Sequence, residues 1–462
     1  MSDERHIRDR SLWLDTFPGP IRPRPALQGD TDCDVAIVGA GMTGLWTAYA
    51  LLDADPSLRV RVIEREVAGF GASGRNGGWV SAGIAGVAEE WAKHSGAEAV
   101  RQAERVTWES VDWIGERVAQ EQIDCGFVKG GILSVARTAA QEERVREYID
   151  YHRQWGWGEE DVRALSPAEV AERVAIADAR LASFSPHGAR VNPARLVRGL
   201  ADAVERKGGI IYEQTAARFI EPGRVVTEHG TVRADHVVRA TEAFTVQFKQ
   251  QSRTYLPLYS LMIATEPLPQ AVWDELGWNG CETISDAHHL FFYAQRTTDN
   301  RIAIGGRGAP YGLGSPVDEA YERHDGVKAR LTNTLYSAFP ATRGAAITHH
   351  WGGALGVPRD WSMSVTHDPA TGLAFAGGYS GHGVAATSIS GRTLADLILR
   401  RETELTKMPW VNHPVRKWEP EPLRWIASRA IVGIMGSSDR AEDAGAARTA
   451  RRMAIIRPFL GH

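Results

Sequence analysis

The sequence predicts an α/β fold with more than one domain, and three observations support this prediction. First, the β-branched run 35–38 leads into closely spaced glycines, and apolar residues at helical spacing follow. Second, short apolar runs typical of buried strands recur far along the chain, as at 373–376. Third, segments 255–265 and 290–306 alternate or carry aromatic interruptions. These segments predict a second, mixed or antiparallel sheet for a separate substrate domain.

Length and composition narrow the function classes. A chain of 462 residues exceeds one ordinary core, so two or three domains are expected. The chain carries 53 basic and 57 acidic residues, a net charge of -4. This balance argues against nucleic acid or an anionic membrane as a partner and favours a small molecule, with a homo-oligomer left open.

Three further features concern location. Cys33, Cys125 and Cys281 lie far apart and match neither a metal-ligand spacing nor a disulfide framework. A reducing, cytoplasmic location is therefore expected. The polar N-terminus has no signal-peptide core, and no stretch approaches ~20 uninterrupted apolar residues. We therefore predict neither a signal peptide nor a membrane span.

The first motif combines a strand at 34–38 with a helix at 45–53. Gly39 allows the tight turn, Gly41 leaves room for phosphates, and Gly44 lets the helix approach the strand. The helix N-terminus faces the anion. A strand at 59–63 ends at Glu64, 20 residues after Gly44, where a carboxylate can accept hydrogen bonds from ribose hydroxyls. The spacing predicts an adenine dinucleotide site rather than a glycine turn of another α/β sheet.

The remaining elements follow in chain order. Residues 1–30 are rich in proline and arginine and are predicted to lie as an arm over the surface. A long helix is expected at 88–122 and a strand pair at 127–136, turned at Gly130 and Gly131. Further helices are predicted at 141–151, 166–175, 192–207 and 384–401, and further strands at 210–212, 224–228 and 236–240.

A second glycine-rich motif occupies residues 72–78. Its small residues let the main chain run against a planar ring system. Ser73, Arg75 and Asn76 are candidates to donate hydrogen bonds to a diphosphate. The alternative is a flexible glycine loop.

A third motif occupies residues 377–384, between a buried strand and a helix. A helix N-terminus placed there stabilises negative charge on the pyrimidine edge of a reduced flavin. His382 is open to two interpretations, a catalytic base or a residue that supplies backbone contact and shape. Its position between two glycines favours the second.

Together the three motifs resemble the D-amino-acid-oxidase-type FAD-dependent oxidoreductases from about residue 31 to residue 401. Segments 260–268 and 301–307 are similar to the branch that contains gamma-glutamylputrescine oxidase and related bacterial amine oxidases. The resemblance implies that FAD lies across a discontinuous Rossmann-like domain, with the substrate held over the flavin by a mixed sheet. It also implies that Ala217 and Thr241 lie near the adenosine half and that 351–353 lies near the isoalloxazine.

The residues expected to bind the cofactor come from these motifs and from the resemblance. They are Gly39, Gly41, Met42, Thr43, Gly44, Glu64, Arg65, Ala72, Ser73, Arg75, Asn76, Gly77, Gly78, Ala217, Thr241, Gly352, Gly378, Gly381, His382, Gly383 and Val384. Relatives that hold the flavin covalently use a histidine or a cysteine. The glycine loop offers Arg75 and Asn76, and no cysteine follows Cys281, so non-covalent FAD is expected.

Aromatic and basic residues of the second domain are the candidates for the substrate site. They are Tyr255, Tyr259, Phe292, Tyr293, Arg307 and His350, with Trp351 next to the last. A site with apolar walls and a few polar side-chain ends suits an amine that must lose its proton and its hydration water before it reacts. Each tyrosine has the alternative of a core role. Arg307 is open to binding a remote carboxylate or to forming a surface ion pair.

We expect four parts in the chain. The parts are an arm at 1–30; an FAD-binding domain at 31–92, 184–252 and 344–404; a substrate domain at 93–183 and 253–343; and a helical segment at 405–462. The last segment is expected to pack on the body or on a second subunit, with an amphipathic membrane-docking helix as the alternative. The pairs His288–His289 and His349–His350 lack metal-ligand spacing, so no metal is predicted.

The resemblance implies oxidation of an amine C–N bond to an imine, which water hydrolyses to an aldehyde and an amine or ammonia. Relatives that act on α-amino acids hold the carboxylate with an arginine in a Gly-Leu-Arg-Pro-like turn, whereas residues 353–358 contain no arginine. Glycine or a D-amino acid is therefore not the expected substrate.

The electron acceptor is left open between oxygen, a quinone and an electron-transfer protein. Some oxidase relatives place a lysine on the strand that matches 301–306, and this chain has none between Lys249 and Lys328. Two alternatives to the amine reaction stand beside it. These are an FAD-dependent 2-hydroxy-acid dehydrogenase that feeds a quinone and a flavin-binding subunit without catalysis of its own.

Overall fold

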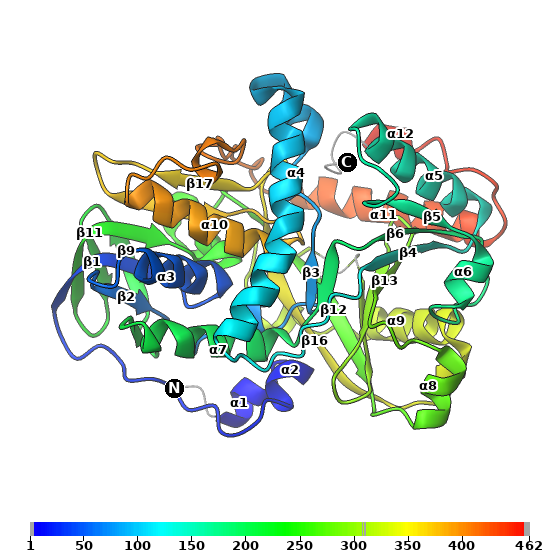
Figure 1. Cartoon of the computed structure of the whole chain (residues 1–462), viewed down its shortest axis with the longest axis horizontal. Helices are drawn as coiled ribbons and strands as arrows, with labels where there is room; N and C mark the ends of the chain where they lie inside the picture. Colours follow the sequence, from blue (N-terminus) through cyan, green and yellow to red (C-terminus); the bar gives the residue numbers. More distant parts are fainter. Residues whose placement is uncertain (1–3, 307, 309–310, 457–462) are drawn as a thin grey trace.

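The computed structural model describes residues 4–306, 308 and 311–456, and the chain forms two eight-stranded sheets with helices around them (Figure 1). The first sheet collects strands from three separated stretches of the chain. In spatial order these are β17 (Ser364–His367), β18 (Leu373–Gly377), β11 (Thr231–Arg239), β1 (Thr31–Val38), β2 (Val60–Ile63) and β8 (Ile210–Tyr212), with β10 (Arg224–Thr227) and β9 (Ala217–Glu221) attached to β11.

The middle of the first sheet is parallel. Strand β1 lies between β11 and β2, and both pairings are parallel. Its residues from Val35 to Ile37 are fully buried, because helices pack against Val35 and Ile37 on one face of the sheet and residues of β9 and β10 pack with Ala36 on the other. The carboxyl ends of these strands therefore meet at one edge, where ligands bind in open α/β sheets.

Helices pack along one face of this sheet. Helix α3 (Met42–Ala54) packs beside α10 (Gly383–Ile398), and α4 (Ala88–Gln120) packs against α10. Helix α4 is interrupted at Gly96, whose φ of +84° is not helical. The other helices are α1 (Glu4–Arg8), α2 (Leu12–Asp15), α5 (Ala139–Gln154), α6 (Pro167–Ala171), α7 (Pro193–Arg206), α8 (Gln270–Leu276), α9 (Asp325–Ala338), α11 (Leu423–Asp443) and α12 (Met453–Ile456).

The second sheet is mixed, as predicted. Its order is β16 (Ile347–Val357), β12 (Leu256–Thr265), β15 (Ile302–Gly306), β14 (Phe292–Arg296), β13 (Thr283–Asp286), β4 (Ile132–Ala136), β6 (Leu181–Ser185) and β5 (Arg163–Leu165). Its pairs are antiparallel except for β13 with β4. A separate two-stranded sheet joins β3 (Trp79–Ser81) to β7 (Gly188–Arg190).

Strand β16 departs from the predicted domain division. The division groups residues 344–404 with the FAD-binding domain, whereas β16 is hydrogen-bonded to β12 from Leu256 opposite Val357 to Thr265 opposite Ile347. This long antiparallel ladder places β16 at the edge of the second sheet. The remaining domain boundaries stay predictions.

The predicted strand pair at 127–136 is wrong. Residues 132–136 form β4, which lies between β13 and β6, and Val128 forms an isolated bridge with Arg190 instead. Leu133 is fully buried. The main-chain hydrogen bonds of this segment are made to the strands on either side of it and not within a local hairpin. The segment 290–306 forms two strands, β14 and β15, that pair with each other.

The predicted surface arm is also wrong for much of its length. Ile7, Leu12 and Leu14 are fully buried, and they pack in one apolar cluster with Trp351 of β16. Helices α1 and α2 lie against the body of the protein (Figure 1). The proline-rich composition concealed an apolar face that helps to form a core. Over the residues that the structure describes, no helix combines the length and hydropathy needed to cross a bilayer.

Candidate active site

One cavity of about 950 Å³ runs from the carboxyl edge of the first sheet to helix α11. Its lining contains most of the predicted cofactor-binding residues. These are Gly39, Gly41, Met42, Thr43, Glu64, Arg65, Ala72, Ser73, Arg75, Asn76, Gly77, Ala217, Thr241, Gly381, His382, Gly383 and Val384. The first sheet and the loops around it thus bring together residues from six separate parts of the sequence.

The turn after β1 requires its glycines for close packing. Gly39 has a φ of +109°, and a Cβ there would lie 2.6 Å from the carbonyl oxygen of Ala240. A Cβ on Gly44 would lie 2.0 Å from the Gly39 carbonyl oxygen. Helix α3 therefore begins at Met42 close against the strand, with its first N–H groups toward the cavity.

Glu64 stands at the end of β2, inside the cavity wall. Its carboxylate accepts hydrogen bonds from the main-chain N–H groups of Ala40, at 2.8 Å, and Glu66, at 2.9 Å. Burial raises the pKa of this carboxyl above its usual range. The two N–H donors fix the side chain at the position predicted for a ribose-binding carboxylate.

The loop at 72–78 begins with the short 3₁₀ helix η1 (Ala72–Gly74). The Ser73 hydroxyl accepts a hydrogen bond from the Met42 N–H at 2.9 Å, which joins this loop to the start of α3. The Asn76 side-chain amide donates to the carbonyls of Ala72 and Ser73. Asn76 therefore closes the loop on itself, a role different from the predicted donation to a diphosphate.

Arg75 also has a different role from the predicted one. Its guanidinium lies 2.6 Å from the Glu322 carboxylate, and it donates to the carbonyl oxygen of Gly352 at 3.3 Å. Burial lowers its pKa, while Glu322 opposes that shift. Arg10 of the N-terminal segment contacts the same carboxylate. The buried cation thus holds the cofactor loop against two other segments and is not directed at a diphosphate.

The loop at 377–384 enters helix α10 at the cavity. Gly378 and Gly381 have φ values of +84° and +109°, which allow the tight turn. His382 is the N-cap of α10, and its Nδ1 lies 2.9 Å from the Ser81 hydroxyl. The Tyr379 hydroxyl lies 2.9 Å from the Thr43 hydroxyl. These contacts place the N-terminus of the 16-residue helix α10 at the cavity, as predicted.

Glu242 is a cavity residue that the sequence analysis missed. It follows Thr241 at the carboxyl end of β11, has a φ of +40°, and accepts a hydrogen bond from the Gly356 N–H at 2.6 Å. Burial raises its pKa to about 7. Its place after a central parallel strand was the signal that could have identified it.

Two of the predicted tyrosines line the far part of the cavity. The Tyr293 hydroxyl lies 2.6 Å from the Ser260 hydroxyl across the second sheet. The Tyr259 hydroxyl accepts a hydrogen bond from the Asp318 N–H at 2.9 Å, and burial raises its pKa to about 12. Both rings are therefore held in place by hydrogen bonds at their polar tips.

The other predicted substrate residues lie elsewhere. Tyr255 is buried with its hydroxyl against Gly377, outside the cavity lining. His350 bonds to the Met262 carbonyl through Nδ1, and Trp351 donates to the Arg75 carbonyl, so both lie outside this cavity. Arg307 lies outside the described residues. Phe292 belongs to the second apolar core.

Four of the glycines that were predicted to bind the cofactor lie outside the cavity lining. These are Gly44, Gly78, Gly352 and Gly378, of which each would bring a Cβ within 3.1 Å of another atom. They let neighbouring segments approach closely, which shapes the cavity from behind.

Helix α11 supplies a cavity wall that the sequence analysis did not assign to the site. Its residues at the cavity are Leu423, Arg424, Ala427, Ser428, Ile431, Val432 and Met435. They recur at helical spacing, so one face of α11 covers the cavity. The preferred expectation that this segment packs on the body of the protein agrees with this arrangement.

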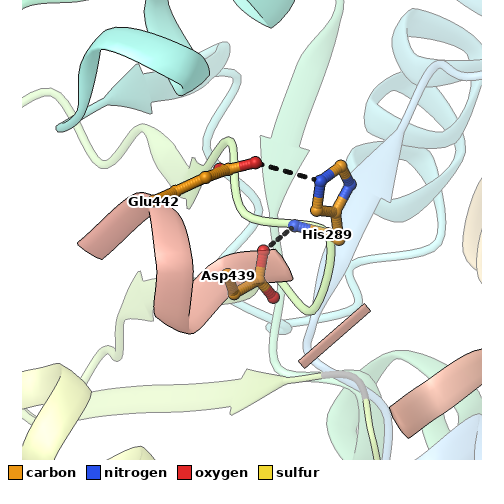
Figure 2. Close-up of side chains that lie close together, drawn as sticks. All are labelled: His289, Asp439 and Glu442. Atoms are coloured by element: carbon orange, nitrogen blue, oxygen red, sulfur yellow. Dashed lines mark hydrogen bonds and ion pairs between the residues drawn. The ribbon is translucent and has the colours of Figure 1, made fainter. Parts of the chain in front are cut away.

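The far end of α11 carries a cluster of a histidine and two carboxylates (Figure 2). Ligand atoms of His289, Asp439 and Glu442 lie within 4.8 Å of one another. The Asp439 carboxylate already accepts the main-chain N–H groups of His289 and Leu290, at 2.9 and 3.0 Å. Glu442 forms a two-pronged ion pair with Arg144, at 2.9 and 2.6 Å. Because a guanidinium occupies this cluster, we assign it to anchoring α11 and not to a metal.

Comparison with known proteins identifies relatives over most of the chain. The family model described as FAD dependent oxidoreductase, DAO, matches residues 34–397. Gamma-glutamylputrescine oxidoreductase of Escherichia coli (strain K12) is 30% identical over 81% of this chain and 86% of its own length. Glycine oxidase of Geobacillus kaustophilus is 25% identical over 82% of this chain and 96% of its own.

Solved structures agree on the fold. The crystal structure of glycine oxidase from Geobacillus kaustophilus superposes with a TM-score of 0.67 at 23% identity, over 83% of this chain and 99% of that one. The iminodiacetate oxidase of Chelativorans sp. BNC1 gives 0.63 at 18% identity, over 82% and 100%.

The residues present fit the cofactor of this family. The glycine turn before α3 is closed to any added Cβ, the N-termini of α3 and α10 meet the same cavity, and Glu64 is held at the ribose position. A phosphate-binding turn and a second helix N-terminus in one cavity suit a dinucleotide with an electron-accepting ring. The chain belongs to the DAO family of FAD-dependent oxidoreductases, and its cofactor is FAD.

Proposed function

We propose that this protein oxidises an amine at its C–N bond. The substrate carbon loses a hydride and the nitrogen loses a proton, which leaves an imine. Water then hydrolyses the imine to an aldehyde and an amine or ammonia. Bound FAD supplies the acceptor for the two electrons.

The observation that carries this proposal is the continuity of the cavity. The same cavity contains the dinucleotide-binding turn at one end and the rings of Tyr259 and Tyr293 with the apolar face of α11 at the other. A largely apolar compartment next to the redox ring excludes water and favours the neutral form of an amine. Neutral nitrogen is the form that can release electrons to an acceptor.

The chain's own residues bind and orient the substrate in this proposal. Tyr259 is held by the main chain of Asp318, and Tyr293 is held by Ser260, so neither ring is free to rotate away. Fixed aromatic walls position the reacting carbon and lower the entropy lost on reaction. This scheme needs no strong base, because the substrate enters as the neutral amine.

The cavity favours an amine without a carboxylate on the oxidised carbon. Residues 353–358 of the chain contain no arginine, and Leu355 and Val357 line the cavity there. Arg359 lies beside them, but it forms an ion pair with Glu419 at 3.0 Å. An α-carboxylate at this wall would meet apolar side chains, which is unfavourable.

The relatives support chemistry at carbon–nitrogen bonds. Their names include a gamma-glutamylputrescine oxidoreductase and a glycine oxidase. We infer that FAD is bound without a covalent link and that oxygen or another acceptor reoxidises it.

A panel of substrates under anaerobic conditions tests the proposal. The purified holoenzyme is mixed with primary and secondary amines, α-amino acids and 2-hydroxy acids, and loss of the flavin absorbance is followed. We expect amines to bleach the flavin. Bleaching by 2-hydroxy acids alone, or by none of the compounds, would overturn the proposal. Parallel assays of hydrogen peroxide and of dye reduction then identify the acceptor.

A further inference from the structure

Helix α11 lies outside the part of the chain that matches the DAO family, yet it forms a wall of the substrate cavity. The family match ends at residue 397, and α11 spans Leu423–Asp443. In Figure 1 α11 lies over the second sheet, on the side of α5 and α12. This chain therefore supplies part of its substrate cavity from its own C-terminal segment.

The part of the α11 face nearer its C-terminal end lines the cavity with apolar residues only, whereas the part nearer its start also contributes Arg424 and Ser428. The apolar residues are Ile431 and Val432, with Met435 about one helical turn further on. By contrast, Ile426 of the same helix is 53% exposed and does not line the cavity. The apolar face is thus directed into the cavity and is not a general property of α11.

Strands of the second sheet add a further apolar stretch to the lining of the same cavity. This stretch is formed by two cross-strand pairs of the second sheet, Leu258 opposite Leu355 and Leu256 opposite Val357. These residues belong to strands β12 and β16, which also carry Tyr259 and Gly353 of the cavity lining. A ligand group in this part of the cavity therefore meets aliphatic side chains from α11 and from this sheet.

The position of α11 is fixed by ion pairs and hydrogen bonds at both ends. At its C-terminal end Asp439 accepts a hydrogen bond from the main chain of His289 (Figure 2) and one from Leu290, and Glu442 pairs with Arg144. At its start Arg424 donates to the Ser252 carbonyl at 3.4 Å, and Glu421, which pairs with Arg424, accepts a hydrogen bond from the Tyr311 hydroxyl at 2.7 Å. A fixed wall selects substrates by shape and polarity, because it does not rearrange to fit each ligand.

Charges near this wall are paired with one another. Glu419 is the described carboxylate that lines the α11 part of the cavity, and it is bound by Arg359. A second ammonium group on a substrate would enter this space without a carboxylate available to form an ion pair with it. Burial of such a charge without a partner is costly.

We infer that the face Ile431–Val432–Met435 determines substrate specificity, and that the substrate is a monoamine with an unbranched or aryl-bearing apolar chain. The apolar chain packs against this face and against the aliphatic pairs of β12 and β16, and the amine faces the tyrosines. This inference rests on the proposed amine oxidation and adds the class of amine.

The test uses a series of n-alkylamines of increasing length with the holoenzyme. Chain length changes the contact area while the ammonium pKa stays nearly constant, so the rates report contacts with the wall. We expect the ratio of the rate of flavin reduction to the dissociation constant to rise about fourfold per methylene until the wall is covered. An α,ω-diamine of equal length should be about tenfold worse or more.

Variants locate the effect on α11. In Ile431→Ala and Met435→Ala the gain per methylene should fall below about twofold. In the matched control Ile426→Ala the gain should equal that of the wild type, because this side chain points to solvent. If its melting temperature shows that the Ile431→Ala variant folds poorly, Ile431→Val is used in its place. The gain per methylene in Ile431→Val should lie between those of the wild type and the alanine variant.

Three outcomes are distinguishable. Reduction by amines without dependence on chain length, or a preference for diamines, overturns the specificity inference and leaves amine oxidation intact. Equal slopes in Ile431→Ala and Ile426→Ala overturn the role of α11. If no amine in the series reduces the flavin while 2-hydroxy acids do, the proposed function itself fails.

Discussion

The guanidinium of Arg75 and the carboxylate of Glu322 form an ion pair inside the protein, with 2.6 Å between Nη1 and Oε2. Arg75 belongs to the cofactor loop at 72–78, and Glu322 lies 247 residues later in the chain. Arg10 of the N-terminal segment contacts the same carboxylate. One buried carboxylate therefore holds the cofactor loop and the N-terminal segment in place.

Replacement of Glu322 by glutamine should destabilise the protein. The variant leaves the buried Arg75 without its counter-charge and removes one of the two carboxylates that pair with Arg10, which costs about 3 kcal/mol or more. We expect a lower melting temperature and a smaller fraction of retained FAD. Glu319→Gln is the control, because the Glu319 side chain is 54% exposed against 13% for Glu322, and its pair with Arg10 should contribute at most about 1 kcal/mol. Equal effects in the two variants would contradict the proposed role of Glu322.

Replacement of Gly44 by alanine should weaken FAD binding. The new methyl group would lie 2.0 Å from the Gly39 carbonyl oxygen, so the phosphate-binding turn must shift, at a cost of about 1–3 kcal/mol. Titration of the flavin-free protein with FAD measures the change. Gly433→Ala is the matched control in helix α11, where no atom lies within 4 Å of the new methyl group. This control should be neutral or slightly stabilising, since alanine favours helix over glycine.

Glu242 should make the stability of the flavin-free protein depend on pH. Burial raises its pKa to about 7, above the usual value of 4.5. A carboxyl whose pKa is raised on folding stabilises the folded state below pH 4.5, and this contribution is lost as the pH rises through 7. In Glu242→Gln the side chain is uncharged at every pH, so this variant does not lose stability as the pH rises through 7. The difference in melting temperature between variant and wild type should therefore grow from pH 5 to pH 8, and a constant difference would contradict the burial of an ionisable group.

The anchor of helix α11 should depend on the pair between Arg144 and Glu442. The Glu442 side chain is 1% exposed, and although burial opposes ionisation, Arg144 and His289 lower its pKa to about 2. Its stabilising contribution is present above pH 4.5 and is lost as the pH falls toward 2. Glu442→Gln should loosen α11, which limited proteolysis would report as faster cleavage after residue 404. In Glu143→Gln, a change at an exposed site on α5, the cleavage rate should stay at the wild-type value.

Most residues that the local pattern of the sequence predicted to bind the cofactor line the cavity, and their contacts with FAD stay predictions. The turn at Gly39 and Gly41, the carboxylate of Glu64 and the helix that starts after His382 depend on short spacings along the chain. Such motifs are readable because a strand, a turn and a helix adjacent in sequence are also adjacent in space. The mixed character of the second sheet was likewise visible in the alternation of its strands.

Other assignments failed where long-range contacts decide. Arg75 carries donors suited to a diphosphate, but Glu322 and the Gly352 carbonyl occupy them. Tyr255 and Trp351 are aromatic residues of the kind that lines pockets, but Tyr255, just before β12, and Trp351, in β16, are both buried outside the cavity lining. The alternation of a strand fixes which residues share a face, and the packing of the sheet decides which face meets the cavity.

By itself the sequence determined the family, the cofactor and the elements that hold the phosphates, because each depends on residues close together in the chain. The tertiary structure alone decided that α11 lines the cavity and that the N-terminal segment packs against the loop at 72–78. Helix α11 reaches the cavity through the contacts of Asp439 and Glu442 with residues 289, 290 and 144, more than a hundred positions away. No local spacing encodes such contacts, since they form only when separate parts of the chain fold together.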